Sequence, residues 1–200
     1  DDDKYSLTLR MFSVGSNSLG HSDLITIARP VAEELSRITG ETVHIGILEK
    51  TRAVYVLKIE SSHTIRMYSR LGKHIPLYCT AIGKLFLSEM NTEDFNAYLS
   101  EVMKNKTELK RYTPKTLVTK KTLLEELKEV KSLGYARDKE EHEEGITCLG
   151  APIYDLDGNI AAAISVSFPL FRFDATRLEE YAQAVKNAGE EISRNFGYND

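Results

Sequence analysis

The 200-residue sequence predicts an α+β domain, a curved antiparallel sheet of about six strands with helices packed on it. Runs rich in β-forming residues occur in pairs that are separated by short turns, which is typical of β-hairpins. Amphipathic helical segments precede, separate and follow these pairs. Strands and helices do not alternate one for one, so a parallel sheet of βαβ units is not expected.

The composition is that of a globular protein, with 42% hydrophobic and 28% charged residues. A chain of this length can bury about 70% of its unfolded surface, so it needs neither disulfides nor metal to fold. The two cysteines lie far apart, and no secretion signal or long apolar run is seen. We therefore expect a cytoplasmic protein without membrane contact. A net charge of −4 argues against nucleic-acid binding by this chain itself, and the basic stretch 104–121 is expected to be solvated.

In the first half, residues 1–20 are expected to form a helical linker segment that leads into a domain spanning 21–200. A helix is predicted over 23–38, with Ser22 as N-cap, Gly40 after its end, and a bend or break at Pro30. A hairpin of strands 42–49 and 52–60 follows, and a third strand is expected at 64–69.

In the second half, a short helix over 81–90 begins at Thr80 or Cys79, and a second helix is capped by Thr92. A third helix covers 119–133 and ends at Gly134. Strands are predicted at 135–138, 146–154 and 160–168, and a long helix after Asp174 completes the domain.

The turn 155–158 sets the register of the last two strands. A four-residue loop pairs Tyr154 with Asn159 and places Cys148 opposite Ser165, on the same face. A three-residue loop with a bulge would instead place Cys148 opposite Val166, on the other face. We predict the four-residue loop.

Two hydroxyls in an apolar strand are the first functional signal. Ser165 and Ser167 lie two residues apart, so both side chains point to one face. They either bond to each other or to the backbone, or they line a polar hole. Gly83 near a helix start would expose backbone N–H groups that favour a carboxylate. Asp138 can accept hydrogen bonds from the hydroxyls of a ligand.

Catalytic and metal-binding alternatives are weaker. His142 lies near Asp138 and Glu141, but a solvated acidic loop is more often not a metal site. A nucleophilic Cys148 would need a basic neighbour, whereas the acidic residues nearby raise the pKa of its thiol. No phosphate-binding loop or dinucleotide motif occurs, so no cofactor is expected.

A set of ordered motifs resembles the effector-binding domain of IclR-family bacterial transcription regulators, from about Leu7 to the C-terminus. The segments are 23–30, 40–46, 54–61, 76–84, 134–138, 140–145, 148–152 and 162–167. The resemblance implies a GAF-like or profilin-like fold and a sensor of small 2-keto acids or sugar acids, not an enzyme. The implied ligand-binding residues are Ala81, Ile82, Gly83, Asp138, Cys148, Ser165 and Ser167, with Met67 near the pocket.

Further segments, at 5–9, 66–72, 167–173 and 192–198, resemble a branch of the family that represses genes of pectin breakdown. This implies 2-keto-3-deoxygluconate as effector and a repressor that forms homodimers or tetramers. The family's N-terminal winged helix-turn-helix is absent from this chain, so we expect DNA binding only through that missing domain. Two other hypotheses are a GAF-like reductase or hydrolase that uses Cys148, and the sensor domain of a signalling enzyme.

Overall fold

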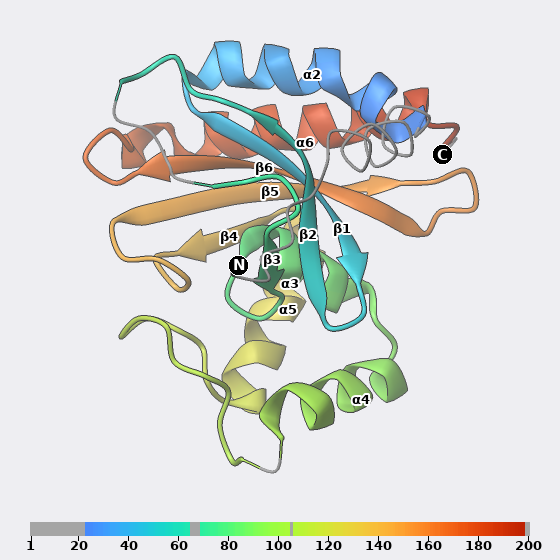
Figure 1. The fold of residues 1–200 in the computed structure, drawn as a ribbon, viewed down its shortest axis with the longest axis vertical. Coiled ribbons are helices and arrows are strands. Elements are labelled where there is room, and N and C mark those ends of the chain that lie inside the picture. Colours follow the sequence, from blue (N-terminus) through green and yellow to red (C-terminus); the bar gives the residue numbers. More distant parts are fainter. Residues whose placement is uncertain (1–22, 65–68, 105, 199–200) are drawn as a thin grey trace, which may run out of the picture.

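The computed structural model describes residues 23–64, 69–104 and 106–198, and shows one sheet covered by helices on both faces (Figure 1). Helices α2 (Asp23–Thr39) and α6 (Leu178–Asn195) lie across one face. Helix α3 (Ala81–Glu89) packs on the other face, and α5 (Lys120–Leu133) packs against α3. Helix α4 (Thr92–Met103) lies beyond them, away from the sheet. The predicted α+β class is confirmed.

The sheet contains six antiparallel strands in the order β3-β2-β1-β6-β5-β4. Two of its hairpins, β1-β2 and β5-β6, were predicted from the sequence, and β1 and β6 join them at the centre. The strands are β1 Thr42–Glu49, β2 Arg52–Ile59, β3 His74–Pro76, β4 Ala136–Lys139, β5 Ile146–Tyr154 and β6 Ile160–Pro169.

The predicted strand at 64–69 is not supported where it can be assessed. Residues 65–68 lie outside the described part of the chain, and Thr64 and Ser69 on either side are not in a strand. The partner of β2 is instead β3, which pairs Pro76 with Arg52. Pro76 lacks an N–H, but the last residue of an edge strand tolerates that loss. The expected linker at 1–20 and the Ser22 cap also lie outside the described residues.

The predicted register of the β5-β6 hairpin is wrong by one residue at Tyr154 and by two residues at Cys148. Cys148 lies opposite Ser167 and Tyr154 lies opposite Ile160, with an irregularity next to Ile153. The turn extends through Asn159 because the Asp155 carboxylate accepts hydrogen bonds from the N–H groups of Asp157 and Asn159. Since side chains alternate with period two, a shift of two residues keeps the face, and Cys148 shares that face with both serines.

Local capping signals account for most helix ends. Thr80, one of the two predicted start residues, caps α3, and Gly134 ends α5 as predicted, with a φ of 71°. Thr119, where the helix was expected to begin, is the N-cap of α5. The cap of α4 is Asn91, one residue before the predicted Thr92. Helix α2 continues through Pro30 without a break. Asp174 caps a 3-10 turn, Ala175–Arg177, that leads directly into α6.

Two apolar cores lie on the two faces of the sheet. The core under α2 and α6 includes Val43, Ile45, Leu149, Ile164 and Val166. The core under α3 and α5 contains residues of β2, β4, β5 and β6 that point to the other face, together with side chains of α3: Ala53, Tyr55, Ala136, Cys148, Ala163, Ile82 and Leu85. The candidate site residues therefore belong to the face that α3 covers.

Gly83 permits α3 to contact the loop before it. A Cβ added at Gly83 would lie 2.2 Å from Leu77 Cα and 2.3 Å from Leu77 O, far inside contact distance. The glycine that the sequence marked as part of a ligand site is thus required by packing.

Gly83→Ala should destabilise the domain by more than about 2 kcal/mol, because the new methyl group meets a fixed backbone. In an ordinary helix the same change stabilises by up to about 1 kcal/mol, so the sign itself is informative. Urea unfolding measures the effect, with Ser88→Ala in the same helix as a control that should change stability by less than about 1 kcal/mol. A neutral or stabilising Gly83→Ala would contradict the close approach.

Candidate functional site

Strand register gathers polar side chains into two adjacent rows on the face under α3. One row runs across β1, β6 and β5 as His44, Ser165 and Gly150. The next row runs across β1, β6, β5 and β4 as Thr42, Ser167, Cys148 and Asp138. Neighbouring strands are about 4.8 Å apart, so each row spans a width suited to a small molecule.

The start of α3 lies beside these rows because two sheet residues lack side chains there. A Cβ at Gly150 would lie 3.3 Å from the Ala81 Cβ, and one at Gly46 would lie 3.1 Å from Ile82 Cγ2. The first turn of the helix therefore rests directly on the sheet, next to His44 and Ser165.

The free donors at this helix start are the N–H groups of Ala81 and Ile82. The Gly83 N–H donates to Thr80 Oγ1 at 3.1 Å, and the Lys84 N–H donates to Thr80 O at 2.9 Å. Within the described residues, the N–H groups of Ala81 and Ile82 have no acceptor. Two adjacent helix N-terminal donors suit a carboxylate.

The polar side chains of the rows are nearly enclosed, with exposed fractions of 2–9% for Asp138, Cys148, Ser165 and Ser167. The Cys148 thiol donates to Ser167 Oγ at 3.2 Å. The Ser165 hydroxyl has no hydrogen-bond partner among the described residues. Asp138 uses Oδ1 to accept the Glu141 N–H at 2.6 Å.

A buried ion network fixes Asp138 relative to α3. The Lys84 side chain is fully buried, and its ammonium donates to Glu141 Oε1 at 2.6 Å, Glu126 Oε1 at 2.8 Å and Arg137 O at 2.8 Å. Lys84 thereby joins α3 to α5, to β4 and to the loop after β4. Glu141 Oε2 is buried with no partner in the described structure.

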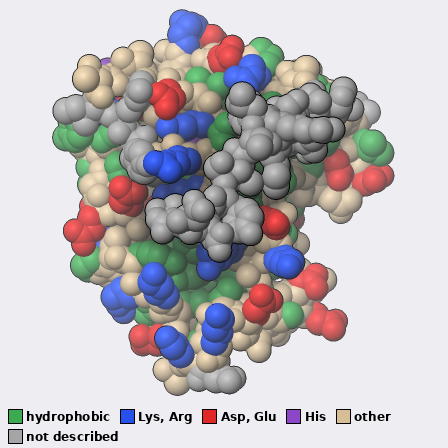
Figure 2. Space-filling model, in the orientation of Figure 1, with side chains coloured by type: hydrophobic (Ala, Val, Ile, Leu, Met, Phe, Trp, Pro, Cys, Tyr) green, Lys and Arg blue, Asp and Glu red, His purple; other side chains and the backbone are tan. Residues whose placement is uncertain are grey.

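The loop after β4 is held from outside by the segment 107–118. The hydroxyl of Thr113 donates to Glu140 O, and that of Thr116 donates to Glu141 O, both at 2.7 Å. The Lys115 ammonium pairs with the Glu140 carboxylate. The segment's basic side chains are exposed, as predicted for 104–121, and Lys and Arg side chains gather on the lower part of the face in Figure 2.

Burial shifts the titration of the groups in this site. It raises the pKa of Asp138 to about 7, and the neighbouring Glu141 carboxylate adds to this rise. Burial also raises the pKa of Glu141, although the Lys84 ammonium opposes it. The pKa of the Cys148 thiol is raised by burial and then by the Asp138 carboxylate. A protonated thiol is a poor nucleophile, which argues against the thiol-enzyme hypothesis.

The structure thus brings together seven of the eight residues named from the sequence: Ala81, Ile82, Gly83, Asp138, Cys148, Ser165 and Ser167. Met67 lies outside the described residues. Sequence reasoning missed His44, which lies directly opposite Ser165. The sequence does contain a signal for His44: it is a polar residue between two apolar residues, Val43 and Ile45, of a predicted strand. No cluster of metal-ligating side chains occurs in the described part of the chain.

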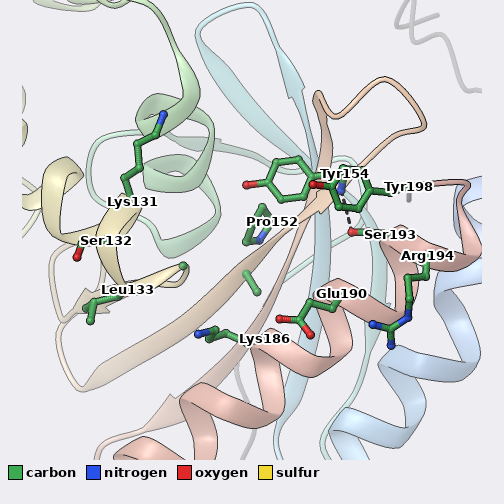
Figure 3. Close-up of a pocket in the computed structure, with 12 residues that line it drawn as sticks. Lys131, Ser132, Leu133, Pro152, Tyr154, Lys186, Glu190, Ser193, Arg194 and Tyr198 are labelled. Carbon is green, nitrogen blue, oxygen red and sulfur yellow. Dashed lines mark hydrogen bonds between the residues drawn. The ribbon is translucent and has the colours of Figure 1, made fainter. Parts of the chain in front are cut away.

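A separate surface cleft of about 400 Å³ lies between the end of α5, β5 and α6 (Figure 3). Lys186 and Glu190 of α6 line it, and the rings of Tyr154 and Tyr198 lie side by side at one end, 5.4 Å apart. None of the predicted site residues lines this cleft. Its size does not make it the functional site, because its charged side chains are mixed in sign and open to solvent.

Residues 16–194 match the family model described as the C-terminal region of the bacterial transcriptional regulator IclR. The chain belongs to the IclR family, and it is the effector-binding domain of an IclR-family transcriptional regulator. It is 42% identical over 200 residues to the HTH-type transcriptional regulator KdgR of Escherichia coli K12, covering all of this chain and 74% of that protein. It is 40% identical to KdgR of Dickeya chrysanthemi, where it spans 64% of the protein.

Solved structures agree with this assignment. The Thermotoga maritima IclR structure superposes with a TM-score of 0.86 at 36% identity, covering 99% of this chain and 78% of that one. The C-terminal domain of E. coli KdgR gives a TM-score of 0.77 at 38% identity, covering 88% and 99%. These relatives are transcription regulators, which supports a regulatory role for the chain. None of the described helices is long and apolar enough to cross a membrane.

Replacing Lys84 by Met should destabilise the domain by about 3–5 kcal/mol, because the Glu141 carboxylate then stays buried without its cation. The double variant Lys84→Met/Glu141→Gln should be less destabilised than Lys84→Met alone, since the buried charge is gone. Chemical unfolding measures both, and the exposed Lys131→Met serves as control. Equal losses in the single and double variants would contradict the proposed pairing.

Asp138→Asn should flatten part of the dependence of stability on pH. The folded pKa of about 7 exceeds the usual value, so between about pH 4 and 7 the folded domain keeps a proton that the unfolded chain has released. The stability from this group is therefore present at low pH and lost as pH rises through 7, with a slope of at most about 1.4 kcal/mol per pH unit. Chemical unfolding at several pH values measures this pH dependence, with Asp157→Asn at an exposed position as the control. If the free energy of unfolding of wild type and of Asp138→Asn changed with pH in parallel, the raised pKa of Asp138 would be refuted.

Proposed function

We propose that the two polar rows and the start of α3 bind a small 2-keto acid or sugar acid, with 2-keto-3-deoxygluconate as the first candidate. The observation that carries the proposal is the convergence of partnerless polar groups at one enclosed place. The N–H groups of Ala81 and Ile82 and the hydroxyl of Ser165 come from distant segments and meet where α3 rests on the sheet.

The carboxylate of the ligand is expected at Ala81 and Ile82. Helix N-terminal N–H groups carry a partial positive charge and bind anions without a cationic side chain. The Lys84 ammonium lies one turn further along α3, but its contacts with Glu126 and Glu141 satisfy it. Binding through backbone donors explains how an acid can be held although the Lys84 ammonium is already paired.

The keto and hydroxyl groups are expected along the rows. Ser165 and Ser167 can each donate or accept, which suits a chain of oxygen atoms. Asp138 can bind the ligand in either of its protonation states. Its carboxylate accepts hydrogen bonds from ligand hydroxyls, and its protonated form donates a hydrogen bond to a ligand carbonyl. The pKa near 7 keeps both forms accessible, so an acidic ligand need not meet a fixed negative charge.

Effector binding is proposed to act on DNA through the parent regulator, a cytoplasmic protein. Lys84 connects the ligand-facing helix to α5 and to the loop after β4. A ligand that favours one arrangement of these elements shifts the population of paired domains and so the spacing of DNA-binding domains elsewhere in the regulator. Pairing into dimers or tetramers and repression of target genes are parts of this proposal.

Thermal unfolding with 2-keto-3-deoxygluconate, pyruvate and glyoxylate tests the ligand class. A ligand at about 100 times its Kd stabilises by about 2.7 kcal/mol, which should raise Tm by several degrees. Ser165→Ala should weaken binding about tenfold, because one hydrogen bond in an enclosed site is lost. Ser132→Ala on α5 is the matched control and should bind as wild type. No stabilisation by any of the three acids would contradict the proposal.

A further inference from the structure

His44 is the buried polar group that the site leaves unexplained. It lies on β1 directly opposite Ser165 of β6, and its side chain is fully buried. Its ring stacks on Tyr55 with the centroids 4.3 Å apart, and its Nε2 lies 2.7 Å from Ser69 Oγ. Its Nδ1 is buried and has no hydrogen-bond partner in the described part of the chain.

The imidazole of His44 is neutral. Burial lowers its pKa to about 3, and the ammonium groups of Lys58 and Lys73 lower it further. Lys58 is paired with His44 across β1 and β2, and its ammonium donates to Ser69 O at 3.0 Å, which holds the serine in place. A neutral ring carries one N–H only, so when Nε2–H donates to Ser69 Oγ, Nδ1 is an acceptor.

Packing alone does not account for a histidine here. A phenylalanine would stack on Tyr55 equally well and would bury no unpaired nitrogen, which is costly inside a protein. Directly opposed residues on neighbouring antiparallel strands have their Cβ atoms about 5 Å apart. His44 therefore lies next to Ser165, whose hydroxyl has no partner among the described residues, and two residues along β1 from Gly46, where Ile82 at the start of α3 rests on the sheet.

We propose that His44 recognises a hydroxyl group of the effector. Its Nδ1 accepts a hydrogen bond from that hydroxyl, and Ser69, by accepting from Nε2–H, fixes the tautomer of the ring that leaves Nδ1 unprotonated. This inference rests on the proposed function and narrows it. A lone-pair acceptor is satisfied by a hydroxyl and repels a second carboxylate. The site therefore selects hydroxylated 2-keto acids over unsubstituted ones, and Ser69 is a positioning residue that acts through His44.

Calorimetric titration with two six-carbon acids tests the inference. 2-Keto-3-deoxygluconate carries hydroxyls, and 2-oxohexanoate has the same keto acid end without them. His44→Phe should weaken binding of the first about tenfold, the loss of one enclosed hydrogen bond, and leave binding of the second within about twofold. Ser69→Ala should cause a smaller loss of the same selectivity, because the ring keeps its place but loses its orienting partner.

The outcomes separate this inference from the proposed function. Wild type that binds neither acid overturns the proposed function and this inference with it. If wild type binds both acids and His44→Phe weakens both equally or neither, the role of His44 is overturned and the proposed site stands. If His44→Phe does not fold, nitrogen NMR of the wild-type imidazole tests the role of His44 instead. An unprotonated Nδ1 whose resonance shifts only with the hydroxylated acid supports that role. A protonated Nδ1 overturns it.

Discussion

The ammonium of Lys84 is the point at which the functional half of this domain is held together. It lies inside the protein with no exposed surface and contacts two carboxylates and one backbone carbonyl. Removing a cation from water is tolerable only when such partners replace its hydration completely. Because those partners belong to α5, β4 and the loop after β4, the position of each depends on the same ion. Asp138 depends on the same ion indirectly, because its carboxylate accepts the N–H of Glu141, whose side chain pairs with Lys84.

This arrangement explains why a polar site can exist beside an apolar core. The sheet is covered on one face by an ordinary apolar layer under α2 and α6. On the other face, Gly46 and Gly150 let α3 approach closely, and the residues just beyond the helix start are polar. The helix excludes water from the rows and also presents its N–H groups to them. Enclosure strengthens each hydrogen bond that a ligand makes there, and it makes each unpaired group costly when the ligand is absent.

Much of the fold follows from local signals. The β1-β2 and β5-β6 hairpins, the Thr80 and Thr119 caps and the glycine at 134 depend on residues close in sequence, and all were predictable. The strand at 74–76 was not predictable, because three residues that end in a proline show no period and pair only through their place at the sheet edge. The register of β5 and β6 failed because the Asp155 side chain extends the turn by one residue and an irregularity between Ile153 and Tyr154 adds a second, which residue types alone did not reveal.

The candidate site divides in the same way. The sequence by itself determined which residues are chemically unusual: two serines in an apolar strand, an aspartate before a loop and a glycine at a helix start. The period-two alternation of strands was enough to place the serines and Cys148 on one face. Only the tertiary structure decided that Gly83 serves packing, that Lys84 is a buried ion and that His44 lies opposite Ser165. The last two facts depend on contacts between residues 42 to 121 positions apart, and the first depends on how the loop before α3 folds back onto the helix; no local propensity reports either.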